Sequence, residues 1–239
     1  MKKIMVLALN DMKNIRRDSM LLPIIIAPIM LTLLARFGIP AIRNMVLEKL
    51  SFDIYPYYDF IALLFLMVIP MMVSIIEGFI LLDDKDEEML SYFAITPLTK
   101  SGYLKYRLIS SLIVCFILIN LFLIFSNLVK YSFLKFMLIS LLASLEGAIG
   151  AIILATFASN KVEGLALSKA LSLFILPSAI AYFVKSKLHW FGAFVPHFWM
   201  EKSFMAALYG NNFILFLTIG LICHMALLYY LVRSLVYKY

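Results

Sequence analysis

Charged residues are scarce in this chain of 239 residues, because Asp, Glu, Lys and Arg together make up only 15% of it. Soluble domains contain about 25%. Hydrophobic residues make up 64%, and the mean hydropathy is +0.99. A water-soluble core of this size cannot bury so much apolar surface. The composition therefore excludes a soluble globular domain and indicates a membrane protein.

Proline and glycine are also scarce, with 8 and 9 residues, which excludes collagen-like and low-complexity disordered chains. The two cysteines, Cys115 and Cys223, both lie inside apolar runs and are expected to act as small buried hydrophobic residues. Strands of membrane barrels alternate polar and apolar residues, whereas the apolar runs of about twenty residues here show no alternation. We therefore predict an all-α polytopic membrane protein.

The apolar runs predict six transmembrane helices in a single transmembrane domain, residues 1–239. A bilayer core of ~30 Å requires ~20 apolar residues per helix. Six stretches approach or exceed this length, namely 20–37, 59–82, 108–129, 133–157, 165–184 and 213–236. Residues 188–208 are more polar, with two His, two Trp and one Pro. We predict that they form an extracellular re-entrant segment before the last span.

Residues 1–19 precede the first span and have the pattern of an amphipathic interfacial helix. Apolar side chains such as Ile4 and Met5 fall on one side, and basic side chains such as Lys3 and Lys13 fall on the opposite side. Such a helix suits the inner surface of the membrane, and a solvated charged tail is the alternative. The first span continues without a small-residue cleavage site, so we do not expect a cleaved signal peptide.

The net charge of +7 is better explained by membrane topology than by nucleic-acid binding, because basic patches interleaved with aromatic residues are absent from the sequence. With residues 1–19 inside, thirteen of the 21 Lys and Arg residues fall on the cytoplasmic side and eight on the other. This excess agrees with the positive-inside rule. Six spans then place both termini in the cytoplasm, with a long inner loop at 83–107.

That inner loop is the most informative part of the sequence. It begins with five carboxylates in six residues, 83–88, and MLSYFAI and Thr96-Pro97 follow. We predict a short helix with an acidic start, which the helix dipole favours, and an end at Pro97. Tyr92, Phe93 and Ile95 are apolar enough to indicate that something covers them. The alternative is a solvated connector.

This loop resembles the one between the second and third spans of ABC-2-type permeases, the membrane subunits of ABC exporters (type V exporter fold). The matching residues are Glu87, Leu90, Thr96, Pro97, Leu98 and Tyr103. A second resemblance, at the fifth span, is carried by Asn160, Glu163, Gly164, Lys169 and Pro177. A third is the FVPHFW element at 194–199, which is similar to the family's extracellular re-entrant helices. The resemblance covers most of the chain.

The resemblance implies a mechanical rather than a catalytic role. Family members pair two six-span units, so the expected partners are a second copy or a sister permease and a cognate ATP-binding subunit. The loop helix would dock on that subunit through Asp86, Glu87, Glu88, Leu90, Phe93, Thr96, Pro97 and Leu98. The sequence has no G-x-x-x-x-G-K-[ST] phosphate loop, so we expect ATP and Mg²⁺ to bind the partner and no cofactor to bind this chain.

Two carboxylates lie inside predicted spans, where a charge costs ~2.5–3.5 kcal/mol on insertion scales. Glu146 is surrounded by small residues such as Gly147 and Gly150, which allow close helix approach. It is a candidate for the substrate path, and a protonated or hydrogen-bonded structural role is the alternative. Glu77 is a second candidate, but it lies close to Asp83 and is able to snorkel to the inner surface.

The three histidines, His189, His197 and His224, lack the spacing of metal ligands and are interpreted as interfacial anchors, with no metal site. An intramembrane metal-dependent protease using Glu77, Glu146 and these histidines is the alternative function. The two readings differ in one expectation, because an exporter should tolerate loss of the histidines and a protease should not. A secondary transporter is disfavoured because the two halves show no inverted repeat.

The sequence therefore predicts the permease subunit of an ATP-driven exporter. The low charge of the spans favours an amphipathic or hydrophobic substrate such as a peptide, drug or lipid. The abundance of Ile, Lys and Phe is typical of an AT-rich bacterial genome, which predicts a bacterial plasma membrane as the location. We expect no catalytic residues on this chain.

Overall fold

The computed structural model describes residues 21–89, 93, 95, 99–130, 132–184, 186–210 and 212–238, and every regular element among them is a helix. Six stretches are long and apolar enough to cross a membrane, namely Ile26–Leu50, Tyr55–Asp86, Gly102–Ser126, Phe133–Phe157, Lys161–Phe183 and Phe213–Leu235. The prediction of an all-α, six-span membrane protein is confirmed. The predicted helix at 1–19 lies outside the described residues.

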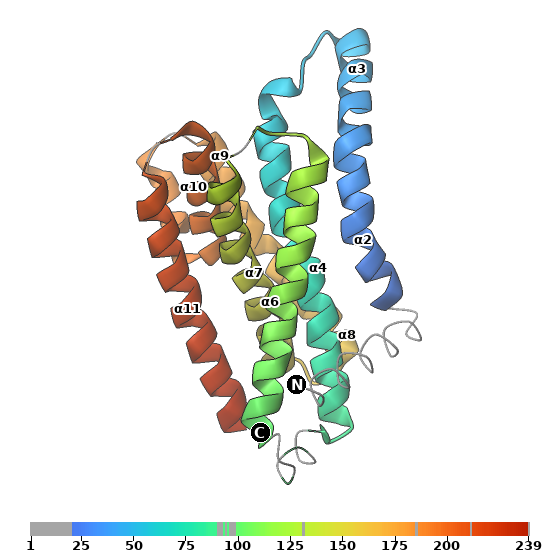
Figure 1. The fold of residues 1–239 in the computed structure, drawn as a ribbon, viewed down its shortest axis with the longest axis vertical. Coiled ribbons are helices and arrows are strands. Elements are labelled where there is room, and N and C mark those ends of the chain that lie inside the picture. Colours follow the sequence, from blue (N-terminus) through green and yellow to red (C-terminus); the bar gives the residue numbers. More distant parts are fainter. Residues whose placement is uncertain are drawn as a thin grey trace.

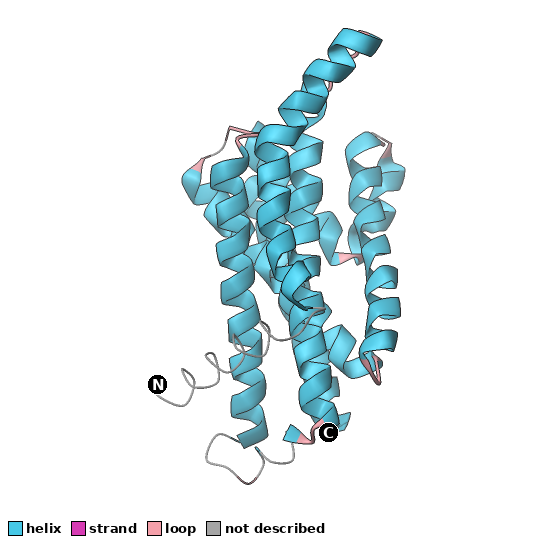
Figure 2. Ribbon diagram, turned by 90° about the vertical axis from the view of Figure 1, so that its right-hand side faces the viewer, coloured by secondary structure: helices cyan, strands magenta, loops and turns pink. Residues whose placement is uncertain are grey.

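The first span is longer than predicted. Helix α2 (Leu21–Leu33) continues through a π-helical turn, η1 (Leu34–Gly38), into α3 (Ile39–Leu50), which projects beyond the other helices (Figures 1 and 2). The π turn ends two residues before Pro40, which cannot donate a backbone hydrogen bond, and the N–H of Ile39 bonds to the carbonyl of Leu34. A helix therefore occupies much of residues 38–58, which connect the first two predicted spans.

An ion pair links α3 to the segment that follows it. Arg43 Nε lies 2.7 Å from Asp53 Oδ1 and Arg43 Nη2 lies 2.9 Å from Asp53 Oδ2. Hydrogen bonds from Arg43, and then from the backbone N–H of Tyr55, lower the pKa of Asp53 to about 2. The pair is therefore charged throughout the physiological pH range.

Helices α4 (Tyr58–Asp86), α6 (Thr99–Ser126), α7 (Phe133–Phe157) and α11 (Phe213–Lys238) form the main bundle, with α7 packed against the other three (Figure 1). The contact between α4 and α7 is close because small residues line it. A Cβ atom on Gly150 would lie 2.6 Å from Ser74 Cβ, and one on Gly78 would lie 2.7 Å from Leu154 Cδ1. This confirms the close helix approach predicted around Glu146.

Gly150→Val is expected to lower the free energy of unfolding by about 1–3 kcal/mol, because the added methyl groups collide with α4. Thermal unfolding of the purified protein measures the effect. Ala41→Val adds bulk at an exposed position of α3 and is the control. A Gly150→Val protein as stable as this control would contradict the close α4–α7 contact.

The fifth span is interrupted. Helix α8 (Lys161–Ser172) passes through a 3₁₀ turn, η3 (Leu173–Ile175), into α9 (Leu176–Phe183), whose second residue is Pro177. Proline is well accommodated in the first turn of a helix because its missing N–H is not needed there. The helix starts at Lys161, before the predicted boundary at 165.

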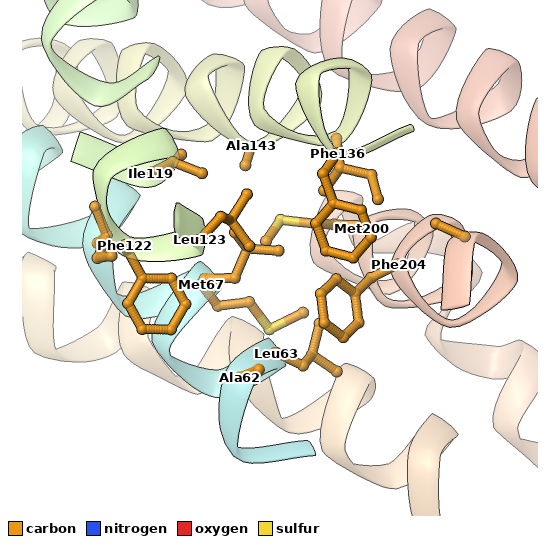
Figure 3. Close-up of a cluster of buried hydrophobic side chains, with 14 of the residues drawn as sticks. Ala62, Leu63, Met67, Ile119, Phe122, Leu123, Phe136, Ala143, Met200 and Phe204 are labelled. Carbon is orange, nitrogen blue, oxygen red and sulfur yellow. The ribbon is translucent and has the colours of Figure 1, made fainter. Parts of the chain in front are cut away.

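The second part of the segment before the last span packs into the bundle, whereas the first part is largely exposed. The segment consists of η4 (Lys187–Phe194) and α10 (Pro196–Tyr209). Figure 3 shows Met200 and Phe204 of α10 in one apolar cluster with Leu63 of α4 and Phe136 of α7. His197 at its start approaches Glu146 in the middle of α7, whereas Tyr209 at its end donates a hydrogen bond to Asp59 at the start of α4. The two ends of α10 therefore lie at different depths, and membrane re-entry of 188–208 stays a prediction.

Candidate functional site

The first part of the acidic run at 83–88 ends a helix, which the sequence did not predict, and the second part directly precedes Met89, which is again helical. The predicted short helix with an acidic start stays a prediction, because residues 90–92 lie outside the described residues. Residues up to Asp86 belong to the last turn of α4, and Glu87 and Glu88 form the turn that follows. Carboxylates are unfavourable at the negative end of the helix dipole, so nearby cations must compensate them. Asp83 Oδ2 lies 2.9 Å from Lys161 Nζ, and Asp84 Oδ2 lies 2.7 Å from Arg107 Nη2. Because both cations are distant in the sequence, the local pattern did not reveal this arrangement.

A buried cluster of Asp84, Tyr103, Arg107 and Phe93 joins α4 to the start of α6. Arg107 Nε donates to the Tyr103 hydroxyl at 2.6 Å, and the Tyr103 hydroxyl donates to Asp84. The ring of Phe93 stacks on Tyr103 with 4.6 Å between centroids. The predicted cover for Phe93 is therefore part of this chain, and we call these four residues the Asp84 cluster.

The predicted coupling residues fall into three groups. Asp86, Glu87 and Glu88 are exposed, and Ile95 is 85% exposed near the same end of the bundle. Phe93 is buried in the Asp84 cluster. Leu90, Thr96, Pro97 and Leu98 lie outside the described residues.

The acidic end of α4 is also tied to the connection between α7 and α8. Lys85 Nζ donates to the carbonyl oxygen of Ala158 at 3.3 Å, and Lys161 pairs with Asp83. Asn160 begins α8, because its side-chain oxygen accepts hydrogen bonds from the N–H groups of Val162 and Glu163, each at 3.0 Å. A displacement of the acidic end of α4 would therefore be transmitted to α6 and α8 through these contacts.

Asn160→Ala is expected to lower the free energy of unfolding by about 1 kcal/mol, because it leaves two N–H groups at the start of α8 without their acceptor. Asn160→Asp keeps an acceptor and is the matched control. Thermal unfolding compares the two proteins. Equal losses of stability would contradict a capping role for Asn160.

The second part of the site lies in the interior of the bundle, at Glu146. Its side chain is only 3% exposed. His224 Nε2 of α11 lies 3.3 Å from Glu146 Oε1, and His197 Nε2 of α10 lies 3.4 Å from Glu146 Oε2. Interfacial anchoring is therefore wrong for these two histidines, because the His224 side chain is fully buried and the His197 side chain is only 12% exposed. Spacing along the sequence gave no sign of this group, because its members come from three helices.

The hydrogen bonds of His224 locate one proton. Its Nδ1 lies 2.7 Å from the carbonyl oxygen of Gly220, which only accepts, so Nδ1 carries hydrogen. With Nδ1 protonated, Nε2 of a neutral ring is an acceptor, and so is an ionised carboxylate. The contact between Nε2 and Glu146 Oε1 therefore requires one further proton, held by the carboxyl or by the ring. Either form leaves the pair with no net charge.

Glu146 and His197 line a cavity between α4, α7, the interrupted fifth span, α10 and α11. The cavity has a volume of about 480 Å³ including its open mouth, and its wall is apolar except for Ser74, Glu146 and His197. Small-molecule pockets typically have walls of this kind, mostly apolar with a few polar groups. The arrangement suits an amphipathic ligand.

Glu77, the other candidate carboxylate, does not line the cavity. It is 8% exposed, and Ser110 Oγ of α6 donates to its Oε1 at 3.4 Å. Snorkelling to the inner surface is therefore wrong for Glu77, because packing against α6 holds it inside. Within the part of the chain that the structure describes, no three His, Cys, Asp or Glu side chains are arranged to hold a metal ion.

Comparison with known proteins gives one consistent relationship. Residues 11–232 match the family model described as fluoroquinolones export permease protein Rv2686c-like. Two curated relatives are the fluoroquinolones export permease proteins MT2760 and Rv2686c from two strains of Mycobacterium tuberculosis. Each is 26% identical over 228 residues, which cover 94% of this chain and 90% of the relative. No solved structure matches the chain.

Proposed function

Because the chain belongs to the Rv2686c-like family of fluoroquinolone export permeases, we propose that it is the membrane subunit of an ATP-driven exporter of fluoroquinolone-like drugs. The observation that carries the proposal is the cavity inside the bundle, with its apolar wall and its few polar side chains, Ser74, Glu146 and His197. Fluoroquinolones are compact aromatic molecules with polar ends, and such a cavity matches this chemistry. The family favours a permease over the intramembrane protease.

The energy would come from a separate ATP-binding subunit that carries ATP and Mg²⁺. The exposed carboxylates Asp86, Glu87 and Glu88 form the docking surface in this proposal. The Asp84 cluster and the ion pair between Asp83 and Lys161 support it, because they connect that surface to α6 and α8. Movement of α8 would alter the cavity, since Leu171 of α8 lines it.

The proposed assembly has the ABC-2 arrangement. A second copy or a sister permease completes a dimer in the bacterial plasma membrane. The end of α11 and the end of α4 lie at the same end of the bundle (Figures 1 and 2), which we place in the cytoplasm. The cavity would then open alternately toward the cytoplasm and toward the outside, and no chemistry would occur on this chain.

Drug accumulation in cells tests the proposed function. Cells without their own exporters, expressing this chain with its ATP-binding subunit, should accumulate less norfloxacin than cells expressing either subunit alone. Replacing the phosphate-loop lysine of the ATP-binding subunit should restore accumulation. Reduced accumulation by this chain alone, without the ATP-binding subunit, would contradict an ATP-driven exporter.

Charge reversal tests the docking surface. Glu87→Lys combined with Glu88→Lys should abolish co-purification of the ATP-binding subunit, because both side chains are exposed and the substitutions reverse the charge of the proposed docking surface. Glu48→Lys reverses an exposed carboxylate of α3, at the opposite end of the bundle, and should leave co-purification unchanged. Retention of the subunit by the double variant would exclude this surface.

A further inference from the structure

We propose that Glu146 and His197 recognise a protonated amine of the transported drug, and that the bound amine replaces the proton held between Glu146 and His224. This inference rests on the proposed function and deepens it by naming the chemical group that the cavity selects. It predicts a preference for cationic amphipathic drugs over their uncharged analogues.

The first observation is unused hydrogen-bonding capacity at the cavity wall. Glu146 Oε2 and both ring nitrogens of His197 are buried without hydrogen-bond partners, although the two side chains lie 3.4 Å apart. Burying such groups unpaired is unfavourable, so the site is better satisfied when a ligand supplies donors. A secondary ammonium has two N–H groups and would donate one to Glu146 Oε2 and one to a ring nitrogen of His197.

The second observation is that the two carboxylate oxygens of Glu146 have different neighbours. Oε1 faces His224, which is fully buried and does not line the cavity, whereas Oε2 faces the cavity-lining His197. One oxygen is therefore engaged by the protein, whereas the other has no hydrogen-bond partner among the described residues. The same carboxylate would contact the proton in the unliganded state and the amine in the bound state.

Charge balance explains why the ammonium group of the drug and the proton of the Glu146–His224 pair would not be bound at the same time. Without ligand, the Glu146–His224 pair holds one proton and has no net charge. An ammonium group placed beside that neutral pair would have no opposite charge at the site, which is costly inside the membrane. If the pair releases its proton to water as the ammonium binds, the ionised carboxylate balances the ammonium, and the neutral His224 no longer hydrogen-bonds Glu146 Oε1. One proton leaves for each amine bound, and no other bond changes.

The remaining titratable groups near Glu146 do not provide another carboxylate that could bind the amine. The residues that α4 and the fifth span contribute to the cavity are Met71, Ser74, Leu171 and Phe174, and none of them carries a charge. On α6, Cys115 packs against Gly147. On α10, Glu201 is paired with Lys202 at 3.3 Å. Glu77 is engaged by Ser110. Among the described residues, Glu146 is therefore the one carboxylate that lines the cavity.

Binding of two matched drugs to the purified exporter complex tests the proposal. Norfloxacin carries a secondary amine, and N-acetylnorfloxacin has the same ring system and carboxylic acid but no basic amine. We expect the complete complex to bind norfloxacin about ten- to a hundred-fold more tightly than its acetylated analogue at pH 7.5. Raising the pH from 6.5 to 7.5 should strengthen the binding of norfloxacin by up to tenfold more than the binding of N-acetylnorfloxacin, because norfloxacin displaces one proton from the site. Titration of the shared carboxylic acid cancels in this comparison.

Variants then assign the effect to the site. Glu146→Gln should reduce the affinity for norfloxacin to that for N-acetylnorfloxacin and remove the additional pH dependence. Glu201→Gln removes a buried carboxylate from α10 that does not line the cavity, and it should keep the preference. Thermal unfolding confirms that each variant is folded, and the comparison of the two drugs on the unmutated complex does not depend on any variant.

The outcomes separate this inference from the proposed function. Equal binding of both drugs by the unmutated complex would overturn amine recognition while leaving drug export intact. A preference for norfloxacin that survives Glu146→Gln would also overturn it. Binding and export of neither drug would overturn the proposed function together with the inference.

Discussion

Replacing Arg107 with leucine is expected to lower the free energy of unfolding by about 3–5 kcal/mol, because it leaves Asp84 buried without its cation. The side chains of Arg107 and Asp84 are only 5% and 15% exposed, and their charged atoms lie 2.7 Å apart. Arg107 also donates to the Tyr103 hydroxyl, so the substitution removes a second hydrogen bond from the Asp84 cluster. Thermal and denaturant unfolding of the purified protein measure the loss.

Two comparisons show whether the loss comes from the unpaired charge. The double replacement Asp84→Leu, Arg107→Leu should recover most of the stability, because apolar residues often replace a buried ion pair without cost. Arg43→Leu breaks an ion pair whose side chains are 34% and 38% exposed, and it should have a much smaller effect. If Arg107→Leu and Arg43→Leu were equally stable, the Asp84 cluster would not be a buried connection between α4 and α6.

Replacing His224 with leucine is expected to reduce drug export at least tenfold and to lower the free energy of unfolding by about 1–3 kcal/mol. His224 is fully buried, and leucine removes the partner of Glu146 Oε1. The carboxyl group is then left in the interior without the ring that shares its proton. Drug accumulation in exporter-deficient cells measures export, and thermal unfolding measures stability.

His189 provides the matched control for this prediction. It lies in η4, partly exposed, with its Nδ1 2.6 Å from the carbonyl oxygen of Ser186. His189→Leu should leave export nearly unchanged. Equal export by the His224→Leu protein and the native protein would contradict a role for the Glu146–His224 pair. The expectation that an exporter tolerates loss of every histidine is thus retained for His189 alone.

The six spans were predictable because they depend on the length of each apolar run, which can be read directly from the sequence. Their ends were less predictable, because local interactions extend them. The π turn before Pro40 carries the first span through to Leu50, and the side chain of Asn160 starts α8 at Lys161. A hydropathy pattern contains neither a helix cap nor a change in hydrogen-bond register.

The functional site was predicted only in part, because its geometry depends on residues far apart in the sequence. Small residues around Glu146 correctly indicated a close helix contact, and Glu146 does line the cavity. Its partners His197 and His224 come from other helices, so no spacing rule related them. The extension of α4 into the acidic run was missed for the same reason, since the cations that stabilise it, Arg107 and Lys161, lie in α6 and α8.

Drug uptake into reconstituted lipid vesicles tests most directly the central claim that a separate ATPase drives drug transport through this chain. Vesicles containing both purified subunits should accumulate norfloxacin when ATP and Mg²⁺ are added outside, and a non-hydrolysable ATP analogue should not support accumulation. Vesicles containing this chain alone should accumulate none. Equal accumulation by this chain alone would contradict the claim, as would ATP hydrolysis by the complete complex without any drug movement.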